Sequence, residues 1–308
     1  MDLQPHPLTL DLAKLEGLSQ RLVASHHENN YAGAVKRLNA IRGQLAQLDW
    51  PSAPVFVVNG LKREELIAAN SAWLHELYFD GLGGDGQLAD CGLSIALERD
   101  FGSVARWRDE FVAMGKALGG GSGWVLLSFQ PRDGSLVNQW AADHTQAVAG
   151  GVPILALDMY EHAYHMDFGA RAAAYVEAFM KNIRWDGVYA RYDAAVAADA
   201  APWAASPAAI REAGLLIDVR RAATYANAAD QLAGAAWKDP AKLAEWSAGL
   251  DRSSPVLVYC FHGLDIGRST ALALRARGFD ARYIAGGIEA CREAGVELAP
   301  TGVVATPA

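Results

Sequence analysis

The stretch VPILALDMYEHAYH, residues 152–165, contains the residues that decide the fold of the first half of the chain. Its apolar run 152–157 predicts a buried strand that ends at Asp158. His162 follows four residues later, where one turn of a following helix would place its side chain on the same side as the carboxylate. A carboxylate and an imidazole so placed suit a manganese or iron ion. The same spacing fits a capping aspartate and a half-buried histidine, so spacing alone leaves both interpretations open.

Helical periodicity surrounds this stretch on both sides. Short apolar or alternating runs bounded by turn residues predict three strands between the helices. The predicted helical regions are 9–49, 61–79, 93–118 and 162–183, and the predicted strands are 123–130, 136–142 and 152–158. An order of helices, small sheet and helices is typical of an α+β domain.

Residues 152–164 resemble the iron/manganese superoxide dismutase signature Asp-x-Trp-Glu-His-Ala-Tyr. Three upstream segments resemble that family in the same order: SHHENNYAGAVKRLN (25–39), NSAWLHELYF (70–79) and GGGSGWVLL (119–127). The resemblance spans nearly the whole first domain. It implies an α+β fold with a helical hairpin and a three-stranded sheet.

The resemblance also implies a site and an activity. It gives the metal ligands as His26, His75, Asp158 and His162, holding one Fe or Mn ion per chain, with a water or hydroxide completing the shell. The implied reaction is the disproportionation of superoxide to oxygen and hydrogen peroxide. The shared ligands leave the choice between iron and manganese open.

Two further roles follow from the same resemblance. Family members carry a histidine or a glutamine near the position of His144 that hydrogen-bonds the metal-bound solvent, so His144 is the candidate for that role. Glu161 matches a glutamate that pairs with a metal-ligand histidine of the partner subunit. The resemblance therefore implies a homodimer.

The chain departs from the family pattern around the expected substrate entrance. The usual gateway tyrosine and its accompanying histidine fall at Ala34 and Asn30, and Tyr31 is the residue that could fill the space. Tyr160 replaces the signature tryptophan, and His165 replaces a second tyrosine. A metal-binding or stress-sensing scaffold with little dismutase activity is therefore the alternative.

A second domain follows an Ala-rich stretch. We predict a first domain at 1–195, a linker at 196–208, a second domain at 209–300 and a tail at 301–308. Apolar runs of buried parallel-strand type alternate with helical segments, which predicts an α/β domain. The predicted strands are 214–219, 255–260 and 281–284, and the predicted helices are 239–249 and 268–277.

A cysteine loop marks the chemistry of this second domain. Cys260 ends a buried strand, a Gly-containing loop follows, and a helix N-terminus next in the chain would stabilise a thiolate or persulfide. This loop, LLIDVRRAATY (215–225) and GGIEAC (286–291) resemble a rhodanese-like domain. The resemblance implies that Cys260 takes sulfur from a sulfane-sulfur donor and passes it to a thiol or other thiophilic acceptor.

The loop is longer than the usual Cys-x-x-Gly-x-Arg-Ser, because Arg268 lies eight residues after Cys260. The alternatives are a sulfurtransferase acting through Cys260 and an inactive docking or sensory module. We expect Asp218 and Arg220 to fix internal hydrogen bonds. The other two cysteines, Cys91 and Cys291, are expected to be packing residues.

Composition excludes several other classes. The net charge of −8 disfavours a nucleic-acid partner, which needs clustered Lys and Arg. No apolar run approaches the length of a membrane-spanning helix, and the N-terminal residues lack a secretory pattern, so we expect a cytoplasmic protein. Three cysteines without CxxC spacing disfavour a disulfide framework and a zinc site.

Overall fold

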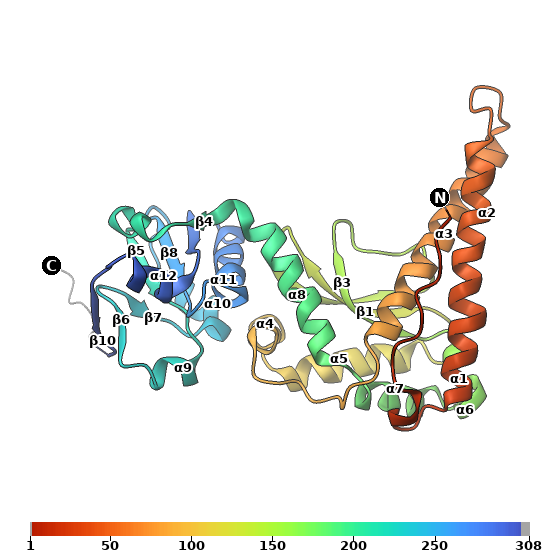
Figure 1. The fold of residues 1–308 in the computed structure, drawn as a ribbon, viewed down its shortest axis with the longest axis horizontal. Helices are drawn as coiled ribbons and strands as arrows, with labels where there is room; N and C mark the ends of the chain where they lie inside the picture. Colours follow the sequence, from red (N-terminus) through yellow and green to blue (C-terminus); the bar gives the residue numbers. More distant parts are fainter. Residues whose placement is uncertain (1, 303–308) are drawn as a thin grey trace. The chain divides into compact units, whose positions relative to one another are not determined.

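The computed structural model describes residues 2–302, which form two compact units (Figure 1). The first unit comprises the described residues up to 88 together with 108–128 and 138–188. The second comprises 89–107, 129–137 and the described residues from 189 onward.

Helices dominate residues 20–117 and 165–200, as the periodicity predicts. They are α1 (Gln20–Ser25), α2 (Ala32–Ala46), α3 (Val55–Asp80), α4 (Gly92–Phe101), α5 (Val104–Ala117), α6 (His165–Phe168), α7 (Ala172–Lys181) and α8 (Trp185–Ala200). The Ser19 side chain caps α1 by accepting the N–H of Leu22 at 3.1 Å. Between α1 and α2 the chain makes a π-helical turn, His26–Tyr31, so the two helices follow each other with almost no break.

Helices α2 and α3 form an antiparallel hairpin, which Figure 1 shows as two long neighbouring helices. Buried residues of α2 pack against small residues of α3. This packing holds the two helices in register, and so positions His26, in the turn before α2, relative to His75 in α3. The cluster consists of Leu38, Ile41, Leu45, Ala68 and Ala69.

The three predicted strands are present and form one sheet in the order β2-β1-β3. Their bounds are Trp124–Gln130 for β1, Ser135–Ala141 for β2 and Val152–Asp158 for β3. The last five residues of β3 are buried, and Asp158 at its end has no exposed surface. The strand therefore delivers a carboxylate into the interior of the first unit.

The C-terminal part of the second unit contains a five-stranded sheet in the order β4-β9-β8-β5-β7. All four neighbouring pairs of strands in it are parallel, and a separate antiparallel pair joins β6 to β10. The bounds are β4 Ala204–Ala205, β5 Leu215–Asp218, β6 Asp230–Leu232, β7 Ala236–Trp237, β8 Val256–Tyr259, β9 Ala281–Ile284 and β10 Leu298–Pro300. The predicted α/β class and its three main strands are thus confirmed.

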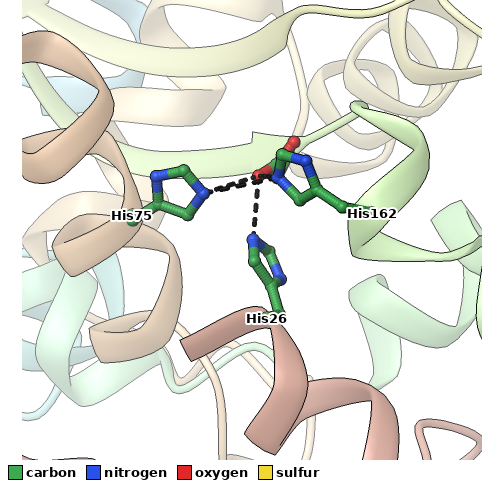
Figure 2. Close-up of side chains that lie close together, drawn as sticks. His26, His75 and His162 are labelled. Carbon is green, nitrogen blue, oxygen red and sulfur yellow. Dashed lines mark hydrogen bonds and ion pairs between the residues drawn. The ribbon is translucent and has the colours of Figure 1, made fainter. Parts of the chain in front are cut away.

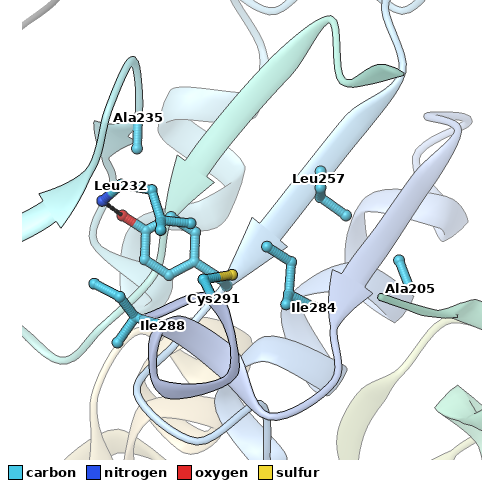
Figure 3. Packing of buried hydrophobic residues seen from close by; sticks show 8 residues of the cluster. Ala205, Leu232, Ala235, Leu257, Ile284, Ile288 and Cys291 are labelled. Atoms are coloured by element: carbon cyan, nitrogen blue, oxygen red, sulfur yellow. Dashed lines mark hydrogen bonds between the residues drawn. The ribbon is translucent and has the colours of Figure 1, made fainter. Parts of the chain in front are cut away.

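Four helices accompany this sheet: α9 (Ala222–Ala226), α10 (Leu243–Ser247), α11 (Asp265–Ala276) and α12 (Gly287–Glu293). Helix α11 begins three residues before the predicted start at 268. On one side of the sheet a core of small and branched side chains surrounds Tyr259, whose hydroxyl accepts the Leu232 N–H at 3.1 Å (Figure 3). The labelled members of this core are Ala205, Leu232, Ala235, Leu257, Ile284, Ile288 and Cys291. Cys291 is completely buried there, as expected of a packing residue.

The Ala-rich stretch has more regular structure than its composition suggested. Helix α8 continues to Ala200, a 3-10 turn covers Ala201–Trp203, and β4 then pairs with β9. Alanine is the strongest helix former, so the run extends the preceding helix when no breaker intervenes. The domain boundary at 196–208 stays a prediction.

No helix among residues 2–302 combines the length and apolar character needed to cross a lipid bilayer.

Candidate metal centre and cysteine loop

Four side chains from distant parts of the sequence converge in the first unit. One ligand atom each from His26, His75, Asp158 and His162 lies within 4.8 Å of the others. Figure 2 shows the three imidazoles directed at one carboxylate. His26, His75 and Asp158 are buried, whereas the side chain of His162 is 27% exposed. The structure therefore brings together the four residues that the sequence resemblance gave as ligands.

A different kind of element positions each of the four residues. His26 opens the π-helical turn, His75 lies in α3, Asp158 ends β3, and His162 lies in the 3-10 turn Glu161–Ala163. The Nε2 atoms of His26, His75 and His162 lie 3.1, 3.5 and 3.2 Å from Asp158 Oδ2. The 3-10 turn replaces the predicted helical turn after Asp158, and it still brings His162 back to the carboxylate.

Neighbouring groups fix the orientation of the ligands. His75 Nδ1 lies 2.6 Å from the Ser71 carbonyl oxygen, so it carries the proton and leaves Nε2 free for a metal ion. Asp158 Oδ1 accepts the Tyr160 N–H at 2.8 Å, and the Asp158 carbonyl accepts the Tyr175 hydroxyl at 2.8 Å. Sequence reasoning missed Ser71 and Tyr175, because both act through contacts that only the folded chain creates.

The electrostatics of the cluster favour a cation. Burial lowers the pKa of His26, and it lowers the pKa of His75 to about 3, so both imidazoles are neutral at pH 7. Burial alone would raise the pKa of Asp158, but hydrogen bonds and charge interactions with His162 and His26 hold that pKa well below its usual value. Neutral imidazoles around one carboxylate fit iron or manganese, which accept mixed nitrogen and oxygen ligands.

His144 lies beside this cluster. Its ring centroid is 6.3 Å from that of His75, and it stacks on Tyr160 at 4.7 Å with an interplanar angle of 8°. Trp124 Nε1 donates a hydrogen bond to His144 Nδ1 at 3.0 Å. Burial lowers the pKa of His144, so the ring is neutral and its proton lies on Nε2.

Tyr31 is buried next to His75, with ring centroids 6.5 Å apart. Its hydroxyl donates to Glu76 Oε1 and accepts the His6 N–H, both at 2.8 Å. Burial, with a contribution from Glu76, raises the pKa of Tyr31 to about 12. Its use as a substitute for the missing gateway tyrosine stays a prediction.

Two other residues lie away from the ligand atoms. Glu161 is exposed, although its neighbour His162 belongs to the cluster. His27 places Nε2 2.9 Å from the His6 carbonyl oxygen, so its ring is engaged away from the metal-ligand set.

Cys260 follows β8 directly in the second unit and is 5% exposed. The N–H groups of Gly263, Leu264 and Gly267 are directed at its sulfur. Burial nevertheless raises the pKa of the Cys260 thiol, and the nearby Asp265 acts in the same direction. The longer loop thus keeps an amide cradle around the sulfur but adds a carboxylate at the start of α11.

Asp218 and Arg220 form a completely buried ion pair. Arg220 Nη2 donates to Asp218 Oδ2 at 2.6 Å, and the Tyr259 hydroxyl donates to the same oxygen at 3.0 Å. Arg220 also donates to the Asp230 carbonyl at 2.9 Å. These bonds link β5, β8 and β6, which is the structural role that the sequence predicted for the pair.

Acid should destabilise the metal-free first unit. The folded-state pKa of His75, about 3, lies below its unfolded value near 6.5, so the unfolded chain binds more protons between these values. The contribution of neutral His75 to the free energy of unfolding is fully present above about pH 6.5, and it is lost as the pH drops toward 3, by on the order of several kcal/mol. The lowered pKa of Asp158 adds to this loss below about pH 4. The measurement is the unfolding midpoint of chelator-treated protein from pH 7 to pH 4. His75→Gln should flatten the profile, and parallel profiles for the two proteins would contradict the assignment.

Comparisons with known proteins agree with both halves of this architecture. Residues 89–191 match the family model of the C-terminal domain of iron/manganese superoxide dismutases, and residues 203–294 match that of the rhodanese-like domain. An iron superoxide dismutase of Cupriavidus metallidurans is 67% identical over 190 residues, covering 62% of this chain and 96% of that protein. An iron superoxide dismutase of Aquifex pyrophilus is 33% identical over 192 residues, covering 60% and 88%. A manganese superoxide dismutase of Halobacterium salinarum is 32% identical over 178 residues, covering 57% and 87%. The chain therefore belongs to the iron/manganese superoxide dismutase family, as a superoxide dismutase with an appended rhodanese-like domain.

Proposed function

We propose that His26, His75, Asp158 and His162 hold one Fe or Mn ion and that superoxide is converted to oxygen and hydrogen peroxide at this site. The observation that supports the proposal is the approach of four buried or half-buried ligand atoms to within 4.8 Å of one another. The relative with 67% identity is named for iron, so iron is the first metal to test.

A bound Fe or Mn ion would supply the redox chemistry, which is the exchange of one electron with each of two superoxide ions. The chain supplies the electrostatic setting. Asp158 contributes one negative charge in a buried position, and the neutral imidazoles of His26 and His75 add none. His162 is the least buried of the four ligands, with 27% of its side chain exposed, which supports access of a small anion from its side.

His144 holds a proton at a defined atom near the site. Because the Trp124 N–H occupies Nδ1, the neutral ring keeps its hydrogen on Nε2. Stacking on Tyr160, whose pKa is raised to about 12 by burial and the nearby Asp158, fixes the plane of the ring. This arrangement supports a role for His144 as a hydrogen-bond donor toward the solvent or substrate at the site.

Removing a ligand should remove the metal. Asp158→Asn keeps the shape but deletes the charge, so the purified variant should retain less than about a tenth of one ion per chain and lose at least about 100-fold in dismutation rate. Elemental analysis and a superoxide-consumption assay give the two readouts. His27→Gln is the matched control, because this neighbouring histidine bonds to a carbonyl outside the cluster and should keep both metal and activity. Wild-type protein that retains metal without dismutation would favour the scaffold alternative.

We also propose a homodimer formed through the face that carries Glu161. This carboxylate is exposed in a single chain and adjoins His162, so it can reach a histidine of a second copy. Glu161→Ala should shift the chain from dimer to monomer in sedimentation at micromolar concentration, whereas Asp109→Asn, an exposed acid on α5, should not. A wild-type monomer, or a dimer unaffected by Glu161→Ala, would contradict the proposal.

A second activity is proposed for the rhodanese-like domain. The amide groups directed at Cys260 support a sulfur that becomes negatively charged. In that reaction the Cys260 thiolate attacks the sulfane sulfur of thiosulfate and sulfite leaves. The persulfide sulfur then passes to a thiophilic acceptor such as cyanide, which regenerates the thiolate.

Cys260→Ser should abolish thiosulfate-to-cyanide transfer, since serine cannot carry a persulfide. Cys291→Ala, a change confined to the hydrophobic core, should retain it. Thiocyanate production measures both variants. Equal rates for Cys260→Ser and the wild type would remove Cys260 from this role, and absence of transfer in the wild type would favour a docking or sensory module. A cytoplasmic location stays a prediction of the sequence.

A further inference from the structure

Two of the three cysteines line one cavity of about 440 Å³ in the second unit. Both Cys91 and Cys260 line it, together with Tyr189, Asp265 and Arg221. All three cysteines are free, and Cys291 is enclosed in the hydrophobic core away from this lining. The sequence predicts Cys91 to be a packing residue, whereas the structure places it half-buried on the wall of a cavity.

The start of α11 and three backbone amides surround the sulfur of Cys260. A Cβ at Gly267 would lie 3.3 Å from Cys260 Sγ, so the first turn of α11 packs directly on the sulfur. The three amides directed at that sulfur favour the thiolate, against the desolvation that opposes it. A thiolate is the form of cysteine that attacks a peroxide oxygen.

The backbone next to Cys91 packs closely against the loop that follows Cys260. A Cβ at Gly92 would lie 1.6 Å from Asp265 Oδ2, so only glycine allows this backbone to approach the carboxylate. Asp90 forms an ion pair with Arg221 at 3.4 Å, and its carbonyl accepts a hydrogen bond from the same guanidinium. Residues 90–92 are thus held against the wall that surrounds Cys260. Residues 83–91 contain no helix or strand, and Cys91 ends this connection as the N-cap of α4, where its N–H donates to Ser94 Oγ at 3.0 Å.

We propose that Cys91 and Cys260 form a peroxide-sensitive thiol pair. Hydrogen peroxide, the product of the dismutase reaction, oxidises Cys260, and Cys91 then closes a disulfide with it.

In the first step the Cys260 thiolate attacks one peroxide oxygen and the O–O bond breaks. Hydroxide leaves and takes up the thiol proton, which gives water and a sulfenic acid. In the second step Cys91 sulfur attacks the Cys260 sulfur, the S–O bond breaks, and a second water leaves. Two thiols lose two electrons and two protons in total, and one peroxide is reduced to two waters.

The disulfide would block the proposed sulfur chemistry while peroxide is being produced. This consequence depends on the proposed sulfurtransferase activity, but the disulfide itself does not. Its formation requires the Cα atoms of Cys91 and Cys260 to lie about 4.4–6.8 Å apart. A thiol reductant would restore both cysteines.

The test exposes the full-length chain to added hydrogen peroxide, blocks the remaining thiols, and maps its peptides by mass spectrometry without reduction. We expect one intramolecular link between the peptides that contain Cys91 and Cys260, with Cys291 still a thiol. Because the peroxide is added, the result does not depend on dismutase or sulfurtransferase activity, and a failure here is distinct from a failure of either proposed function.

Variants separate the two steps. Cys91→Ser should leave Cys260 as a sulfenic acid that dimedone captures, and Cys260→Ser should leave Cys91 a thiol. Cys291→Ala is the matched control and should form the same link as the wild type. The proposal is overturned if wild-type Cys260 proceeds to the sulfinic or sulfonic acid while Cys91 stays reduced, if neither cysteine reacts, or if the link joins two chains.

Discussion

The first unit depends on the burial of one carboxylate. Asp158 has no exposed surface, yet its pKa is held low enough to keep it ionised. An isolated buried charge costs on the order of several kcal/mol, so it persists only where partners surround it. Imidazoles from a π-helical turn, a long helix and a 3-10 turn supply those partners. The elements of this unit are arranged so that three histidines reach the end of β3, and a metal ion is the partner that this donor set suits.

The second unit uses a buried charge for a different purpose. Asp218 and Arg220 neutralise each other and join three strands, without leaving a ligand position open. Next to this fixed pair, Cys260 follows the carboxyl end of β8, where parallel sheets commonly place functional loops. One buried carboxylate is therefore suited to a metal centre, and the other stiffens the sheet that presents a thiol.

Much of the fold was predictable from local patterns, and the differences have local causes. The strand that ends at Asp158 and the strand that ends just before Cys260 are continuous apolar runs with clear boundaries. The two-residue strands β4 and β7 carry no periodic signal, and their pairing with longer neighbours creates them. Helix α11 starts at Asp265 because the loop closes around the cysteine sulfur, a contact that periodicity does not contain. The Ala-rich stretch followed helix propensity where composition suggested a linker.

The sequence alone determined the fold classes through its helix and strand patterns, and its resemblance to two families gave the four candidate ligands and the candidate thiol, because residue type and order are properties of the chain itself. Only the tertiary structure decided how these groups meet. The Ser71 carbonyl that orients His75, the Trp124 N–H that sets the proton of His144, and the cavity shared by Cys91 and Cys260 all join residues whose proximity depends on folding. Hydrogen-bond partners and desolvation are properties of three-dimensional neighbours, so no pattern along the chain specifies them.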